Sequence, residues 1–299
     1  MASTESGVGA ACPGERSKLA LIGDAVIIRH TLFSLPFALA AVLLETGGRP
    51  SVVKLILIAL AAASGRNLAN ALNRLIDRNI DARNPRTAGR HLPSGTLLTR
   101  DLALFSIAMG AVLLASTAFL GPLCLALLPA AAVAIGGYSY TKRFTCLCHF
   151  WLGAACAIAP MGALIAISGK VFELRFFALS GAVALWVAGF DILYAVQDID
   201  IDRKEGLHSV PARFGARGAH VLSALSHMGT IAGFALLPLF WPLGPAYWTG
   251  FALASILLAA EHLVAPGGTE KHIRIAAYGI NEVIPLIFLG STILDIYVL

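Results

Sequence analysis

Apolar residues dominate this chain in long stretches, and shorter polar connections separate them. A bilayer core about 30 Å thick is crossed by roughly 20 apolar residues in an α-helix. Stretches of about this length predict a transmembrane helix at residues 26–44, 52–72, 102–120, 122–140, 150–168, 175–196, 219–240, 246–264 and 277–298. The pattern therefore predicts an all-α, polytopic membrane protein with about nine transmembrane helices.

The composition agrees with a membrane protein. Of the 299 residues, 58% are hydrophobic and only 13% are charged, and the mean hydropathy is +0.78. These values are too apolar for a soluble protein of this length. Residues 1–18 are polar and have no apolar stretch directly behind a basic start, so we expect a flexible cytoplasmic tail and not a cleaved signal peptide. Residues 19–299 are expected to form one transmembrane domain.

Basic residues gather on alternate connections between the predicted helices. The connections after helices 2, 4, 6 and 8 are rich in Lys and Arg, whereas those after helices 1, 3, 5 and 7 hold only Arg49, Lys54, Lys170 and Arg175. The positive-inside rule places the first group in the cytoplasm. We therefore expect a protein of the inner (cytoplasmic) membrane with a cytoplasmic N-terminus.

Two polar sets interrupt the apolar pattern, near the ends of the second and sixth predicted helices. The first set is Asn73, Asp77 and Asp81, and the second is Asp191, Asp198 and Asp202. Spacings of four, three and seven residues place each set on one face of a helix. Residues 77–101 and 198–218 are expected to follow as long polar loops, which in compact proteins are usually functional or disordered.

These acidic side chains need a compensating charge. An unpaired Asp at a membrane helix centre costs roughly 2.5 to 3.5 kcal/mol, and a close pair of carboxylates repels by about 4 kcal/mol at an effective dielectric of 20. A divalent cation with oxygen ligands, such as Mg²⁺, would relieve both penalties. The sequence thus predicts metal-bound phosphate chemistry, with the site facing the cytoplasm.

Basic residues on the same side of the membrane separate two interpretations of the acidic sets. Lys142 and Arg143 follow the fourth predicted helix one turn after Tyr138, and Arg29 lies at the start of the first helix. Each alone fits an ordinary interfacial anchor. A diphosphate held by metal and by Lys or Arg needs both signs of charge together. The alternative is a membrane transporter with acidic cation sites, which gains nothing from arginines beside its acids.

The five cysteines show no spacing typical of a zinc site, and we expect them to be small apolar fillers. The histidines are scattered without ligand spacing, so no metal is assigned to them. Membrane phosphatidyltransferases are disfavoured because D-G-x2-A-R is absent, and soluble prenyl synthases because D-D-x2-D is absent.

At this point the residues resemble the UbiA superfamily of intramembrane prenyltransferases, and most closely its 4-hydroxybenzoate polyprenyltransferase branch and relatives in menaquinone synthesis. The resemblance covers most of the chain and is carried by Asn73-Arg-Leu-Ile-Asp77-Arg-Asn-Ile-Asp81, Arg86-Thr-Ala-Gly-Arg90, Leu92-Pro-Ser-Gly, Tyr138-Ser-Tyr-Thr-Lys142 and Tyr194-Ala-Val-Gln-Asp198-Ile-Asp-Ile-Asp202. Two positions depart from the family pattern: Arg74 stands where Asp is usual, and His91 where many relatives have Pro.

The resemblance implies about nine helices around a central cavity open to the cytoplasmic side. It implies Mg²⁺-dependent transfer of a polyprenyl group from its diphosphate to an aromatic acid, in ubiquinone or menaquinone synthesis. The partners are therefore these substrates and membrane lipid, with no nucleic acid.

The resemblance also implies roles for individual residues. The metal ligands are Asn73, Asp77, Asp81, Asp198 and Asp202. The diphosphate is bound by Lys142 and Tyr138, with Arg143 and Arg29. Further substrate contacts are expected from Arg66, Arg86, Arg90 and Tyr194. Asp191 is expected to orient the acceptor hydroxyl or accept the ring proton.

Overall fold

The computed structural model describes residues 17–27, 31–265 and 279–298, and within these ranges it contains helices and no β-strand. Short 3-10 turns, η2 (Val196–Asp198) and η3 (Leu237–Leu239), extend two of the helices. The α-helices are α1 (Lys18–Ala25), α2 (Thr31–Thr46), α3 (Val52–Arg83), α4 (Thr99–Leu120), α5 (Pro122–Thr141), α6 (Cys148–Ser168), α7 (Leu174–Ala195), α8 (Ile199–Lys204), α9 (Val210–Leu236), α10 (Pro245–Val264) and α12 (Ile284–Tyr297).

Seven helical segments in the described residues are long and apolar enough to cross a membrane: those that contain α3, α4, α5, α6, α7, α9 and α10. The all-α, multi-pass prediction is thereby confirmed, but the count of nine spans is not. Helices α2 and α12 are apolar, with 16 and 14 residues. The first predicted span includes residues 28–30 and the last begins at 277, and these positions lie outside the described residues.

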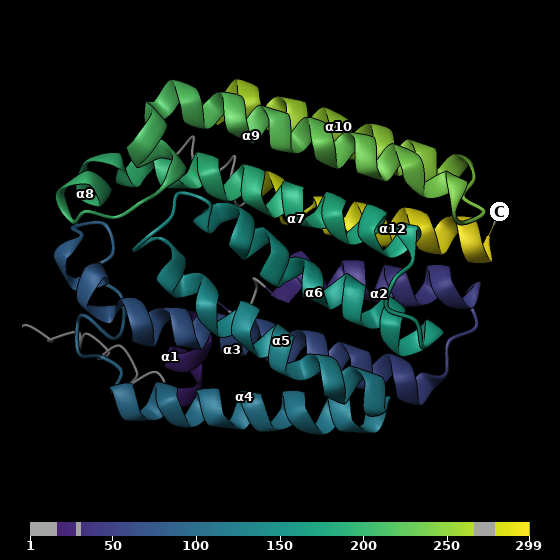
Figure 1. The fold of residues 1–299 in the computed structure, drawn as a ribbon, viewed down its shortest axis with the longest axis horizontal. Helices are drawn as coiled ribbons and strands as arrows, with labels where there is room; N and C mark the ends of the chain where they lie inside the picture. Colours follow the sequence, from purple (N-terminus) through teal and green to yellow (C-terminus); the bar gives the residue numbers. More distant parts are fainter. Residues whose placement is uncertain (1–16, 28–30, 266–278, 299) are drawn as a thin grey trace, which may run out of the picture.

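The long helices run roughly along one direction and form a single bundle (Figure 1). Helix α3 packs against α2, α4 and α5, helix α6 against α2, α5 and α7, and helix α9 against α7 and α10. Helix α12 packs against both α10 and α2. The main core is aromatic where these helices meet, with Phe37 within 5.4 Å of Trp186 and 5.0 Å of Phe288 between ring centroids.

Helix α3 continues well beyond residue 72, where the apolar pattern predicts its end. It extends to Arg83, so Asp77 and Asp81 lie on the helix and not in a loop. The helix ends at Asn84, whose backbone is extended because Pro85 disfavours the helical conformation in the residue before it. The predicted loop at 77–101 is therefore shorter and begins at residue 84.

The second predicted loop, 198–218, is also partly helical. It contains α8 and the start of α9, where the Ser209 side chain accepts a hydrogen bond from the Ala212 backbone N–H at 3.2 Å. Pro211 occupies the first turn, a position that suits a residue without an N–H. The hydropathy pattern did not predict that α9 begins at Val210, because the pattern marks where an apolar stretch begins and not where a helix is capped.

The N-terminal prediction is only partly covered, because residues 1–16 lie outside the described residues. The short helix α1, which the apolar pattern does not predict, begins at Lys18 with Ser17 as its N-cap. The connection after α3 lies near α8 at the left end of the bundle in Figure 1. Both acidic sets are consequently at this end.

Candidate active site

The first acidic set lies along one face of α3, as its four-residue spacing predicts. Asp77 and Asp81 are buried. The Asn73 amide donates hydrogen bonds to Asp77 Oδ2 at 2.8 Å and to the Ser139 hydroxyl on α5 at 3.2 Å. Asn73 therefore connects Asp77, one turn further along α3, to Ser139 on α5.

Asp77 is neutralised by two basic residues that follow α5. Lys142 Nζ lies 2.6 Å from Asp77 Oδ2, and Arg143 Nη2 lies 3.2 Å from Asp77 Oδ1. The Asp77 side chain is only 2% exposed, and a carboxylate so buried needs paired charge. Lys142 and Arg143 therefore contact the first acidic set, and their predicted role toward the diphosphate stays a prediction.

Asp81 is held by the connection that follows α3. Arg90 Nη1 donates to both carboxylate oxygens of Asp81, at 2.7 and 2.8 Å. Arg74, which departs from the family pattern, donates to Asn73 Oδ1 at 3.3 Å and lies 3.8 Å from Asp81 Oδ2. Its guanidinium therefore supplies positive charge inside the set.

Asp198 in η2 is the centre of the second set. It accepts hydrogen bonds from Asn84 Nδ2 at 2.9 Å and from Arg86 Nε at 3.0 Å and Nη2 at 2.5 Å. Arg86 Nη1 also donates to the Tyr194 hydroxyl at 2.6 Å. Burial alone would lower the pKa of Arg86, but its hydrogen bonds and charge interactions with Asp198 and Tyr194 raise that pKa above its ordinary value.

Asp202 lies one turn beyond Asp198 and accepts a hydrogen bond from the Ser209 hydroxyl at 2.6 Å. Ser209 also caps α9, so the start of α9 fixes the position of this carboxylate. Asp202 is close enough to both Asp198 and Lys142 for their charges to act on it. Lys142 is therefore near both acidic sets.

Further contacts join the two sets across the end of the bundle. Arg83 Nε lies 2.6 Å from Glu205 Oε2, and the His208 backbone N–H donates to the Lys142 carbonyl at 2.6 Å. Together with the contacts of Asn84 and Arg86, they bring the polar connections after α3, α5 and α7 to one place. The acidic sets are distant in sequence but adjacent in the fold.

Within the described ranges, no three His, Cys, Asp or Glu side chains converge closely enough to hold a metal ion. The physical reason is that Asp77, Asp81 and Asp198 are each paired with basic side chains. Asp and Asn oxygens are nevertheless the ligands that suit Mg²⁺. The donor chemistry fits this ion, and the basic partners would have to move for the carboxylates to bind it.

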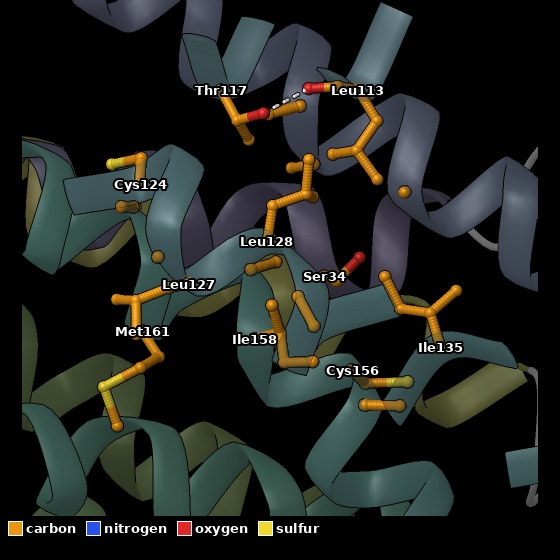
Figure 2. A pocket seen from close by; sticks show the side chains of 18 of the residues that line it. Ser34, Leu113, Thr117, Cys124, Leu127, Leu128, Ile135, Cys156, Ile158 and Met161 are labelled. Carbon is orange, nitrogen blue, oxygen red and sulfur yellow. Dashed lines mark hydrogen bonds between the residues drawn. The ribbon is translucent and has the colours of Figure 1, made fainter. Parts of the chain in front are cut away.

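An apolar cavity of about 400 Å³ lies between α3, α4, α5 and α6. Figure 2 shows carbon-rich side chains around it, including Leu113, Leu128, Ile135 and Ile158. Tyr138 also lines it, and its hydroxyl donates to the Ala69 carbonyl at 3.2 Å. The structure thus places Tyr138 at the cavity wall, and its predicted role toward the diphosphate stays a prediction.

Arg66 is the main charged group of the cavity wall. Its Nη1 donates to Cys156 Sγ at 2.8 Å, while its buried Nε has no hydrogen-bond partner. Asp191 lies close enough for its charge to act on Cys156. Arg66 and Asp191 therefore approach the same part of the interior, on α3 and α7.

Sequence reasoning missed several members of this site. Asn84, Ser139 and Ser209 contact the acidic sets, and His149 Nδ1 lies 2.6 Å from Asp191 Oδ2. Of these residues, only Asn84 could have been suspected from the sequence, because it directly follows the helix that holds the first acidic set. Arg29 was also predicted here, but it lies outside the described residues.

Comparisons with known proteins identify the family of the chain. A model of the UbiA prenyltransferase family matches residues 34–281. A protein of Vibrio parahaemolyticus named 4-hydroxybenzoate octaprenyltransferase is 31% identical over 246 residues, covering 81% of this chain and 83% of that protein. A protein of the same name from Aeromonas hydrophila is 30% identical over 272 residues, covering 88% and 91%.

Solved structures show the same fold. A UbiA homolog from Aeropyrum pernix K1 superposes with a TM-score of 0.82 at 33% identity, covering 90% of this chain and 98% of that one. A UbiA homolog from Archaeoglobus fulgidus bound to GPP and Mg²⁺ has a TM-score of 0.68 at 21% identity, covering 94% and 100%, and at this identity the likeness concerns the fold. The paired acidic sets and the extent of these matches establish that the chain belongs to the UbiA prenyltransferase family.

Proposed function

We propose that the protein transfers a polyprenyl group from a polyprenyl diphosphate to an aromatic acid of the 4-hydroxybenzoate type, in the synthesis of ubiquinone or menaquinone. The observation that carries the proposal is the meeting of two acidic sets and their basic partners at one end of a bundle that also encloses an apolar cavity. The names of the bacterial relatives support the aromatic acceptor.

The basic residues of the site are suited to a diphosphate. Lys142, Arg143 and Arg86 are held near the acidic sets by ion pairs, and Arg90 is paired with Asp81. Such side chains can exchange a carboxylate for a phosphate oxygen, and Arg binds either with paired hydrogen bonds. When the allylic C–O bond breaks, they would stabilise the charge that develops on the departing diphosphate. Tyr194 would orient Arg86 through its hydroxyl.

The ligands proposed for Mg²⁺ are Asn73, Asp77 and Asp81 of the first set with Asp198 and Asp202 of the second. When bound, Mg²⁺ would neutralise diphosphate oxygens and fix the leaving group. A UbiA homolog from Archaeoglobus fulgidus has been solved with GPP and Mg²⁺ bound, which supports this assignment. In this proposal Mg²⁺ takes the place of the Lys and Arg partners of the buried carboxylates, so their negative charge is neutralised whether or not the ion is bound.

The acceptor is proposed to bind beside Arg66 and Asp191. The unpartnered Nε of Arg66 can donate to the carboxylate of an aromatic acid. Transfer breaks the bond between the prenyl carbon and the diphosphate oxygen, forms a carbon–carbon bond to the ring, and releases one ring proton. Asp191 is the proposed acceptor of that proton.

The test is to incubate the purified protein with one polyprenyl diphosphate, Mg²⁺ and a panel of aromatic acids, and to identify the lipid product by mass. A prenylated aromatic acid and free diphosphate are expected in equal amounts. Active transport of a cation in proteoliposomes, with no prenylated product, would instead favour the transporter. The inner-membrane location, cytoplasmic N-terminus and cytoplasm-facing site are part of the proposal, and they can be checked by cysteine labelling of intact cells.

Removal of divalent metal is expected to reduce transfer to background. Without Mg²⁺ the carboxylates would keep their Lys and Arg partners, and the diphosphate charge would lack its main counter-charge. The measurement is product formation with excess chelator, followed by addition of Mg²⁺ or of Na⁺ at equal ionic strength. Recovery with Mg²⁺ alone is expected, and full activity in the chelator would contradict the metal assignment.

Filling the apolar cavity is expected to discriminate between donors by chain length. Gly162 lines the cavity, and a side chain added there would meet nothing within 4 Å, so Gly162→Phe would project into open space. We expect kcat/KM for long donors to fall about 10-fold, because an apolar tail loses burial worth about 25 cal/mol per Å². A ten-carbon donor should be affected less.

The matched control for this variant is Gly110→Phe on α4. Gly110 does not line the cavity, and a side chain there also meets nothing within 4 Å. Equal effects of the two substitutions, or an equal loss for short and long donors, would contradict the assignment of the cavity to the prenyl tail.

A further inference from the structure

His149 is a buried histidine to which the family resemblance gives no role. It lies in the first turn of α6, and its side chain is 5% exposed. Its Nδ1 is 2.6 Å from Asp191 Oδ2 on α7. Its Nε2 accepts a hydrogen bond at 3.3 Å from the backbone N–H of Val210, the first residue of α9. One imidazole thus connects three helices.

These two contacts fix the orientation of the His149 ring. Nε2 faces the Val210 N–H, and Nδ1 faces the Asp191 carboxylate, to which it donates. The imidazole thus holds one oxygen of Asp191 in place and leaves Asp191 free to act as a base through its other oxygen.

The surroundings of Asp191 suit such a role. Its side chain is 27% exposed, whereas its partner His149 is enclosed. Among the described residues, Asp191 has no second hydrogen-bond partner in the structure. The second oxygen can therefore face a substrate in the region of Cys156 and Arg66.

The Val210 contact also relates Asp191 to the diphosphate side of the site. Val210 follows Ser209, whose hydroxyl donates to Asp202 and whose side chain caps α9. Gly215, with a φ of +72°, separates this first turn from the rest of α9. The start of α9 is thus a distinct turn that binds Asp202 through Ser209 and Asp191 through His149.

We propose that His149 is a positioning residue that orients Asp191 toward the aromatic acceptor and fixes its place relative to the turn that holds Asp202. The proposal rests on the proposed function, in which Asp191 accepts the proton released when the ring is prenylated. It acts through Asp191, by keeping the carboxylate in one orientation.

The experiment compares two substitutions that differ in one hydrogen bond. His149→Asn retains an N–H donor close to the position of Nδ1, whereas His149→Phe fills the space without a donor. Wild-type protein is first tested with the aromatic acids, because an absence of product there would overturn the proposed function itself. Steady-state kcat and both KM values are then measured per folded molecule, with folding followed by size-exclusion chromatography in detergent.

We expect His149→Phe to lower kcat about 30-fold with the KM for polyprenyl diphosphate within about two-fold of wild type, and His149→Asn to restore kcat to within about three-fold. In the Asp191→Asn background, His149→Phe should have no further effect, because the two residues act as a unit. His220→Phe on α9 is the matched control and should leave kcat unchanged, since the His220 ring bonds to the Ala216 carbonyl within its own helix.

Three results would overturn the proposal. The first is wild-type kcat per folded molecule in His149→Phe. The second is an equal loss in His149→Asn and His149→Phe, which would show that the ring packs but its donor has no role. The third is an additive loss when His149→Phe is combined with Asp191→Asn.

Discussion

Asp198→Asn is expected to reduce prenyl transfer by about 1,000-fold or more, the largest effect of any single substitution in this site. The carboxylate accepts hydrogen bonds from Asn84 and Arg86 and is a proposed Mg²⁺ ligand. Asn has nearly the same shape but no charge, so it would weaken metal binding and remove the negative charge that is paired with Arg86. Product formation from a labelled polyprenyl diphosphate, measured in purified protein, gives the size of the loss.

Asp200→Asn is the matched control, because Asp200 lies two residues away, is exposed and belongs to the same acidic stretch. It makes the same change in net charge, and we expect activity within about two-fold of wild type because an exposed charge contributes little. If the purified Asp198→Asn protein released diphosphate at the normal rate, Asp198 would not belong to the catalytic site. Equal losses in both variants would instead indicate a general effect of charge at this end of the bundle.

Much of the fold could be predicted because hydrophobic stretches of this length have few alternative structures. The predicted spans coincide with α4 to α7 and α10 to within a few residues. The predicted helix ends were less accurate where a helix runs into the polar end of the bundle. Helix α3 continues through Asp77 and Asp81, and α9 begins at Val210, because caps, ion pairs and Pro85 determine these ends while hydropathy does not.

The sequence indicated which acidic and basic residues to consider, but it could not indicate which of them contact one another. Periodicity along one helix reveals Asn73, Asp77 and Asp81 because these residues are close in sequence. It cannot reveal that Lys142 contacts Asp77, a separation of 65 residues, or that His149 contacts Asp191 across 42. Such pairs depend on which helices pack together and on their rotation about their axes.

The ion pairs also give a physical account of the sequence pattern. In the sequence, basic residues beside acids favour phosphate binding over cation transport, and in the structure the same residues neutralise the acids directly. A buried carboxylate left without a partner would destabilise the bundle by several kcal/mol. The basic residues therefore neutralise the buried acids, and in the proposed reaction they become ligands of the diphosphate.

Lys142→Ala is expected to lower kcat by about 100-fold, because Lys142 pairs with Asp77 and its charge also acts on Asp202 of the second set. Its ammonium is proposed to meet the negative charge that develops as the C–O bond breaks, and loss of one such donor typically costs about 100- to 1,000-fold. The fold should survive, since Arg143 remains 3.2 Å from Asp77 and continues to neutralise it. The measurements are kcat and the KM for polyprenyl diphosphate in purified variants.

Lys204→Ala is the matched control. It removes an exposed lysine at the same end of the bundle and should retain activity within about two-fold. A wild-type kcat in Lys142→Ala, with only the unfolding temperature reduced, would assign Lys142 to the neutralisation of Asp77 and not to the reaction.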